Sequence, residues 1–286
     1  MLDVPEVTRT RRAVPVRAWF DAADPQRLRR ATEDLREGFA KWRLAAALAR
    51  LDIRNRYRGS VLGPLWLTLS TALMLAMLGV LYSALFHQTL RVYVPFLAVS
   101  LITWNLISQV VTDACSSLVL AEGMIRQVPL PYTTHALRGV FRNVVIAAHN
   151  LPLILVAMLA VGRFPGLGAL LALPGLALLV INSFAAALFL GMICARFRDV
   201  GQIVATVMQI AFFMTPVLWQ PAELGNRAVW LPLDPFYVLM QVVRGPLLGD
   251  GAGPLLWLSA AVYTLACCGL SLAFFVRFRG RLAFWV

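Results

Sequence analysis

Residues 50–66 read RLDIRNRYRGSVLGPLW, and this stretch joins two kinds of sequence. Its first half carries four arginines, at positions 50, 54, 56 and 58. From residue 59 to residue 90 no Asp, Glu, Lys or Arg follows. A helix needs ~20 predominantly apolar residues to cross the hydrocarbon core of a bilayer. The basic segment therefore lies where the chain enters a membrane.

The composition of the whole chain agrees with a membrane protein. Hydrophobic residues make up 60% of the chain and charged residues 14%, whereas soluble domains carry roughly 45–50% and about 25%. Six charge-free windows are long enough to span a bilayer. They are 59–90, 92–112, 143–162, 164–195, 200–222 and 251–276. The predicted fold class is an all-α integral membrane protein whose residues 61–286 form a domain of six transmembrane helices.

The basic residues predict how these spans are oriented. With a cytoplasmic N-terminus and six alternating spans, 22 of the 26 Lys and Arg residues fall inside, and Arg91, Arg163, Arg227 and Arg244 fall outside. Cytoplasmic loops carry an excess of Lys and Arg, so both termini are expected in the cytoplasm. The net charge of +12 then reflects topology, and nucleic acid is not expected as a partner.

The N-terminal region is predicted in two parts. Residues 1–37, polar and rich in Arg, read as a cytoplasmic tail that is partly disordered or a loosely docked arm. Residues 38–60 read as an amphipathic helix in the membrane interface plane, with its apolar face toward acyl chains. Its candidate contacts with lipid head groups are Arg50, Asp52, Arg54, Arg56, Tyr57 and Arg58. Gly63-Pro64 is expected to mark the turn into the first span.

Two connections differ from short loops. The inner loop 121–138 contains an amphipathic piece, residues 122–128, closed by Pro129 and Pro131, which could present a rigid helix to a cytoplasmic partner. The outer stretch 220–251 is apolar but too short between its charges to span. Irregular backbone at membrane depth must be buried in protein or line a wet cavity, so this stretch is expected to be re-entrant or flat at the outer face.

The residue types that ATP hydrolysis or ion coupling would need are missing. Lys41 is the single Lys of the chain and has no glycine-rich loop before it, so it cannot serve a P-loop. Asp113 is the single acid in the predicted spans and reads as a helix-end residue wetted from the cytoplasm. Neither the histidines nor the cysteines have metal-ligand spacing. No catalytic, cofactor-binding or metal-binding residue is expected in this chain.

Aromatic residues are the candidates for contact with a cargo. Six of them fall within or at the ends of the first, second and fifth windows: Tyr82, Phe86, Trp104, Phe212, Phe213 and Trp219. One interpretation is core packing and an interfacial belt. The other is a channel lining, because ring faces offer sugar C–H groups many weak positions. The sequence leaves both open.

Four segments resemble the membrane domain of type-2 ABC exporters of the polysaccharide branch, which carries O-antigen, capsule or teichoic acid precursors. They are ARLDIRNRYRGSVLGPLW at the entry, GMIRQVPLP after the second span, RFRDVGQIVATVMQIAFFMTPVLW at the junction of the fourth and fifth, and LPLDPFYVLMQVVRGPLL at the outer face. They occur in the family's order. The resemblance to this family therefore runs from about residue 39 to residue 286.

The resemblance implies a bacterial cytoplasmic-membrane permease that forms a homodimer. Two separate ATPase subunits would bind ATP and Mg²⁺, and a lipid-linked polysaccharide would pass through a channel at the dimer interface. The residues that it assigns to ATPase coupling are Glu122, Met124, Arg126, Arg198 and Asp199. An exporter of drugs or small lipids with the same fold is the alternative, and a membrane scaffold subunit is a second one. Neighbouring genes for glycosyltransferases would favour polysaccharide.

Overall fold

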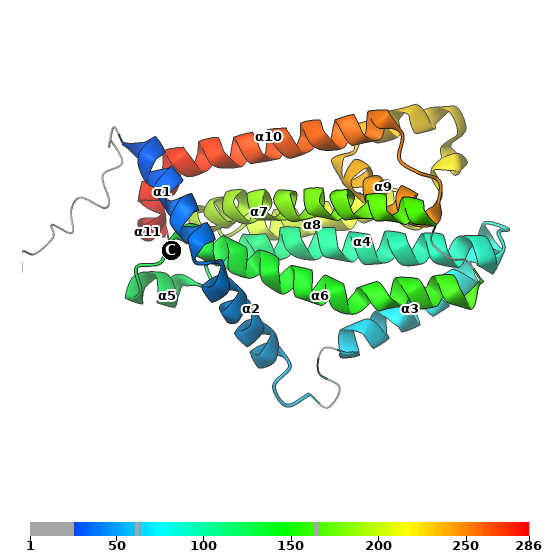
Figure 1. Ribbon diagram of the computed structural model, residues 1–286, viewed down its shortest axis with the longest axis horizontal. Coiled ribbons are helices and arrows are strands. Elements are labelled where there is room, and N and C mark those ends of the chain that lie inside the picture. The colour runs from blue at the N-terminus through cyan, green and yellow to red at the C-terminus, as the bar shows by residue number, and fades with distance from the viewer. Residues whose placement is uncertain (1–25, 61–62, 64, 163–165, 286) are drawn as a thin grey trace, which may run out of the picture.

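The computed structural model describes residues 26–60, 63, 65–162 and 166–285 (Figure 1). The α-helices are α1 (Arg27–Ala40), α2 (Trp42–Arg56), α3 (Leu65–Leu85), α4 (Leu90–Ser117), α5 (Glu122–Gln127), α6 (Tyr132–Ala160), α7 (Ala172–Arg196), α8 (Val200–Met214), α9 (Pro235–Leu248), α10 (Pro254–Phe278) and α11 (Leu282–Trp285). Within the described residues, three 3-10 helices join them: η2 (Leu167–Leu171), η3 (Pro221–Leu233) and η4 (Arg279–Arg281). No strand occurs in these described ranges, as the all-α prediction requires.

Five of the six predicted spans have helices that are long and apolar enough to cross a membrane, counted over the described residues. They are α3, α4, α6, η2 with α7, and α10 with the short helices after it. The fourth was expected from about Leu167 to Ala195, and the helical segment runs from Leu167 to Arg196. These helices make the chain a multi-pass membrane protein.

The fifth predicted span, 200–222, differs from the expectation. Its helix α8 ends at Met214 after 15 residues, which at ~1.5 Å per residue falls short of the ~30 Å hydrocarbon core. Thr215 leaves the helical region with ψ of 139° because the ring of Pro216 disfavours helical geometry in the residue before it. A sixth crossing that uses α8 and the turn after it stays a prediction.

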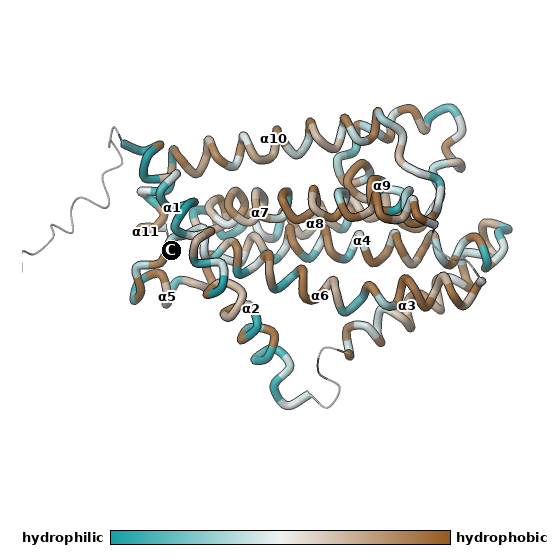
Figure 2. The backbone as a smooth tube through the Cα atoms, viewed as in Figure 1, coloured by the Kyte–Doolittle hydropathy of each residue, from teal (hydrophilic) through white to brown (hydrophobic). Residues whose placement is uncertain are grey.

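The long helices form one bundle along the length of the molecule (Figure 1). Helix α4 lies in its centre and packs against α3, α6, α7, α8 and α9. We call the end that holds α1, α5 and α11 the α5 end, and the end that holds α9 and η3 the α9 end (Figure 1). The helices are mainly hydrophobic along their length, and hydrophilic residues gather at α1 and α2 (Figure 2).

The N-terminal part is more ordered than its sequence suggested. Residues 1–25 of the predicted tail lie outside the described residues, but 27–37 belong to α1, and the expected boundary between 37 and 38 falls inside this helix. Asp34 is buried there against α6. The expectation of a loosely docked arm is therefore wrong for residues 27–37, because a buried carboxylate with partners fixes α1 to the bundle.

The helix expected in the membrane interface is broken and partly covered. The chain leaves helical geometry at Lys41, so α1 and α2 replace the single helix expected over 38–60. Ala45, Ala49 and Ile53 face the protein, where α2 packs on α6. The bulkier Trp42, Leu44 and Leu51 stay exposed, so acyl chains can contact these apolar side chains of α2.

The predicted turn into the first span is only partly described. Gly63 has φ of +54°, a left-handed conformation that glycine adopts without steric cost. Its N–H donates to the Ser60 hydroxyl at 3.1 Å. Pro64, the other residue of the predicted turn, lies outside the described residues. The described half of the motif is therefore a turn ahead of α3.

Candidate functional site

Four charged side chains form a chain of ion pairs at the α5 end. Arg138 on α6 pairs with Asp52 on α2, with its Nε 2.7 Å from Oδ2. Arg142, one helical turn further, contacts the same Asp52 oxygen at 3.3 Å and Asp113 on α4 at 3.0 Å. These side chains are only 16–24% exposed, so solvent screens their attraction weakly. The alternating charges join three helices.

A cavity of about 270 Å³ adjoins this chain of ion pairs. Its lining residues are Asp52, Ser117, Leu120, Ala121, His135, Arg138, Gly139 and Arg142. Within the described residues, both His135 ring nitrogens and Arg142 Nε are buried without a hydrogen-bond partner. Unpaired N–H groups beside two guanidinium groups suit an anionic oxygen ligand.

A second polar contact at this end holds the N-terminal helix. The Asp34 carboxylate accepts from the Thr133 N–H at 3.1 Å and the Thr133 hydroxyl at 2.8 Å. It also accepts from Arg279 Nε at 2.8 Å. A carboxylate at a helix N-terminus satisfies backbone donors that have no partner within the helix. Asp34 thus links α1 to the start of α6 and to η4.

The predicted head-group contacts divide into two groups. Arg50, Arg54, Arg56 and Arg58 are exposed on or just after α2, as lipid contact requires. Asp52 instead turns toward α6 and pairs with Arg138 and Arg142, and Tyr57 is half-buried. The head-group role stays a prediction for the four arginines, and Asp52 has two structural partners that the sequence did not reveal.

The predicted ATPase-coupling residues all lie at the α5 end. Helix α5 has no buried residue, and its Glu122 pairs with Arg126 at 2.8 Å. Met124 is half-buried on the same helix. Arg198 and Asp199 are exposed in the connection from α7 to α8. The structure therefore brings the two predicted coupling segments to one end of the bundle, and their role stays a prediction.

The six predicted channel aromatics fall into two clusters. Tyr82 stacks on Phe86 at 5.6 Å between ring centroids near the end of α3. Trp104 contacts Phe212 at 5.8 Å, Phe213 contacts Phe212 at 5.2 Å, and the Trp219 N–H donates to the Phe213 carbonyl. Exposure separates them: the Trp104 residue is 4% exposed and Phe213 67%. Trp104 is therefore a core residue of a single protomer, whereas the exposed ring of Phe213 can contact another molecule.

Arg244, which the topology placed among the outer charges, is almost fully buried in the α9 end. It is 1% exposed and donates to the Ser100 hydroxyl at 2.8 Å and the Pro216 carbonyl at 2.7 Å. Its guanidinium lies 4.6 Å from the centroid of the Phe96 ring. The outer stretch packs here as α9 against α4, α7 and α10. Whether α9 is re-entrant in the membrane stays a prediction.

Comparison with known proteins identifies the family. The family model for the ABC-2 type transporter matches residues 43–248. The O-antigen export system permease protein RfbA of Myxococcus xanthus is 28% identical over 201 residues, which cover 69% of this chain and 77% of that protein. Two proteins of the same name from Klebsiella pneumoniae are 24% identical over 193 residues, 66% of this chain and 73% of each relative. The chain belongs to the ABC-2 type transporter family.

Proposed function

We propose that this chain is the permease subunit of an ATP-driven exporter that moves a lipid-linked polysaccharide of the O-antigen type across the bacterial cytoplasmic membrane. The observation that carries the proposal is the similarity to O-antigen export permeases over about two thirds of the chain. This similarity lies largely within the segment that matches the transporter family. Two copies would enclose the channel, and two separate ATPase subunits would supply the energy.

The α5 end has features that suit the cytoplasmic side of such a permease. Exposed arginines of α2 can attract anionic head groups, and the nearby cavity presents Arg138, Arg142 and His135. A phosphate or pyrophosphate linker would find donors there. Lys41 is the single Lys of the chain and has no glycine-rich loop before it, so the proposal assigns ATP hydrolysis to another subunit.

The proposal is tested by export in cells. Deletion of the gene in its native host should abolish surface polysaccharide, and the wild-type gene should restore it. Accumulation of lipid-linked polymer inside the deletion strain would place the defect at transport. If surface polysaccharide is unchanged while sensitivity to drugs or the distribution of a small lipid changes, the protein exports drugs or small lipids and not a polysaccharide.

We expect α5 to transmit ATPase movement to the bundle. Replacing Glu122 by glutamine removes the ion pair with Arg126 and should lower transport-coupled ATP hydrolysis in the assembled transporter. Membrane insertion should be unchanged because α5 buries no residue. The matched control is Glu223→Gln, which removes the same charge from exposed η3 at the α9 end. Cross-links from Met124→Cys that reach lipid and never the ATPase subunit would refute the contact.

A further inference from the structure

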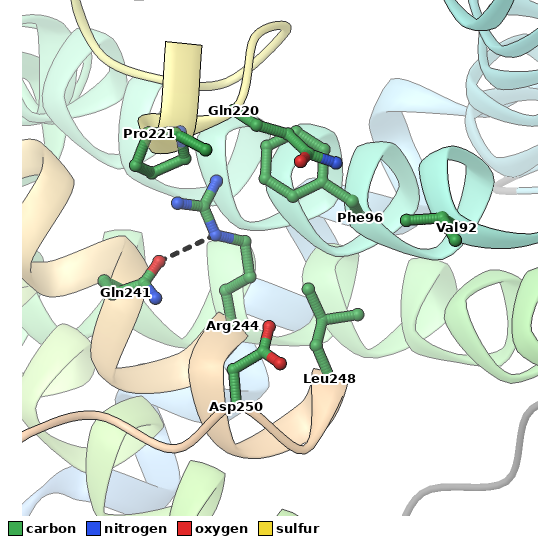
Figure 3. Close-up of a pocket in the computed structure, with 9 residues that line it drawn as sticks. Val92, Phe96, Gln220, Pro221, Gln241, Arg244, Leu248 and Asp250 are labelled. Atoms are coloured by element: carbon green, nitrogen blue, oxygen red, sulfur yellow. Dashed lines mark hydrogen bonds between the residues drawn. The ribbon is translucent and has the colours of Figure 1, made fainter. Parts of the chain in front are cut away.

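A polar cavity of about 250 Å³ lies at the α9 end (Figure 3), far from the ion pairs at the α5 end. It is lined by Val92, Phe96, Gln220, Pro221, Ala222, Gln241, Arg244, Leu248 and Asp250. These residues come from the start of α4, the segment around the start of η3, and the end of α9 with the loop after it. Pockets for drug-sized molecules have volumes of roughly 300–1,000 Å³. This one suits a smaller group.

Arg244 brings an unused donor to this cavity. Its Nε donates to Gln241 Oε1 at 2.8 Å, and its Nη1 donates to the Ser100 hydroxyl and the Pro216 carbonyl. Among the described residues, Nη2 is buried and has no hydrogen-bond partner. A guanidinium stays charged in proteins, and a buried donor without a partner destabilises the fold. An acceptor oxygen that enters the cavity deeply enough to contact this buried nitrogen would satisfy it.

The same cavity also presents acceptors. Asp250 is exposed and its carboxylate is among the lining groups. The backbone holds it there, because its N–H donates to the Gly245 carbonyl at 3.1 Å. A side chain at position 245 would overlap the Gly251 carbonyl, so the glycine lets this loop fold back on α9. Gln220 and Gln241 add amide groups, of which the Gln220 amide already donates to Gln88 at 2.8 Å.

These charges decide between classes of ligand. An anion would meet the Asp250 carboxylate and the C-terminal end of α9, where the helix dipole is negative. A cation would meet Arg244. A hydroxyl group both donates and accepts hydrogen bonds, so it can pair with Arg244 on one side and Asp250 on the other. Val92, Phe96 and Leu248 provide apolar wall for C–H groups. The combination fits an uncharged polyol.

We propose that this cavity is a subsite for one neutral sugar ring of the exported polymer. This inference rests on the proposed function. It adds a binding position for the polymer at the α9 end, the side on which the polymer would leave the membrane. Arg244 Nη2 donates to a ring hydroxyl and the Asp250 carboxylate accepts from another. The subsite contacts the cargo by hydrogen bonds, in contrast to the ring faces proposed for the channel.

The test is sugar binding to the purified full chain in lipid nanodiscs, by saturation-transfer NMR. The probes are mannose, galactose and N-acetylglucosamine. Inorganic pyrophosphate is the anionic probe, and because it has no C–H protons its binding is measured by isothermal titration calorimetry. Asp250→Ala should weaken binding of the preferred sugar about threefold to tenfold, the loss of one hydrogen bond. Glu223→Ala is the matched control, since this exposed acid neighbours Ala222 but does not line the cavity, and it should leave sugar binding unchanged.

The sign of the change with pyrophosphate separates a sugar site from an anion site. Removal of the Asp250 carboxylate would strengthen anion binding in this cavity, whereas a sugar site loses affinity. Pyrophosphate binding to the wild-type chain that rises in Asp250→Ala while sugar binding is unchanged, or no binding of any of the three sugars to the wild-type chain, would overturn the proposal. The Asp250 side chain is exposed, so Asp250→Ala should fold, and thermal unfolding checks this. Loss of export on gene deletion without sugar binding would leave the proposed function standing and refute only the subsite.

Discussion

Replacing Asp34 by alanine is expected to lower the free energy of unfolding by about 3–5 kcal/mol, the usual cost of removing one partner from a buried ion pair. The Asp34 side chain is 0% exposed, and its partner Arg279 is mostly buried as well. The substitution leaves the guanidinium without its carboxylate and leaves the Thr133 N–H and hydroxyl without an acceptor. Helix α1 should then separate from α6 at temperatures where the wild-type bundle is intact.

Glu33→Ala is the matched control for this prediction. Glu33 is the neighbouring acid on α1, its side chain is 53% exposed, and it pairs with exposed Arg29 at 2.8 Å. Exposed pairs of this spacing are worth about 0.3–0.5 kcal/mol. Tryptophan fluorescence during thermal unfolding in detergent compares the two variants. Equal effects of the two substitutions would show that Asp34 is not a structural link.

A double-mutant cycle assigns the effect to the pair. If Asp34 and Arg279 stabilise the fold through each other, Asp34→Ala together with Arg279→Ala should cost less than the sum of the two single changes. Strict additivity would place the stabilisation in the contacts with the Tyr132 and Thr133 N–H groups and the Thr133 hydroxyl. The cycle thus separates the ion pair from the cap on α6.

The sequence predicted the membrane helices well because their signal is local. A run of apolar residues without charge has few ways to satisfy its backbone in lipid other than as a helix. The exception was the window 200–222, where hydropathy continues past the point at which Thr215-Pro216 ends α8. Hydropathy averages over a window and does not register a single proline that breaks the helix.

The N-terminal helix was missed because its stabilising contacts are distant in sequence. Residues 27–40 are strongly charged, and such composition resembles a solvated tail. The face that packs on the bundle is made of the small or polar residues Ala31, Asp34 and Gly38, which give little hydrophobic signal. At Gly38 a side chain would overlap Thr133 on α6. The helical spacing of these three residues was the available clue.

Of the four residues in the chain of ion pairs, the sequence marked only Asp52 as a candidate contact residue, and it did not show the partners of Asp52. Arg138 and Arg142 were counted only as inner charges, yet both lie on α6 and are four residues apart, so they share one face. Their acids come from α2 and α4, and only the packing of three helices brings them together. Arg244 was counted as an outer charge, because the sequence does not show that α9 is buried by its neighbours.

Trp104→Ala is the second change with a large expected effect. The Trp104 ring packs against Phe212 and Phe236, each at 5.8 Å between centroids. Removing a buried Trp or Phe side chain typically costs about 3–5 kcal/mol, since the cavity that remains collapses only in part. We expect less folded protein in the membrane and a fall in export of the same proportion, with no further loss of export per folded molecule.

Phe213→Ala is the matched test of the channel hypothesis. Phe213 touches the same aromatic cluster from its edge, but its side chain is largely exposed, so its loss should change stability by only about 0.5 kcal/mol. The bond from the Trp219 N–H ends on the Phe213 backbone carbonyl and survives the substitution. If this ring contacts the moving polymer, export per folded molecule should fall by up to about fivefold, the equivalent of ~1 kcal/mol of ring contact.

The two variants together separate packing from transport. A fall in folded protein for Trp104→Ala and a fall in export at normal protein level for Phe213→Ala would place the cargo on the exposed side of the cluster. Normal export by well-folded Phe213→Ala would instead assign Phe213 to lipid or to packing between copies. In that case Tyr82, Phe86, Phe212 and Trp219, which are half-buried, would be the remaining aromatic candidates, because the buried ring of Trp104 can meet a polymer only if the core around it opens.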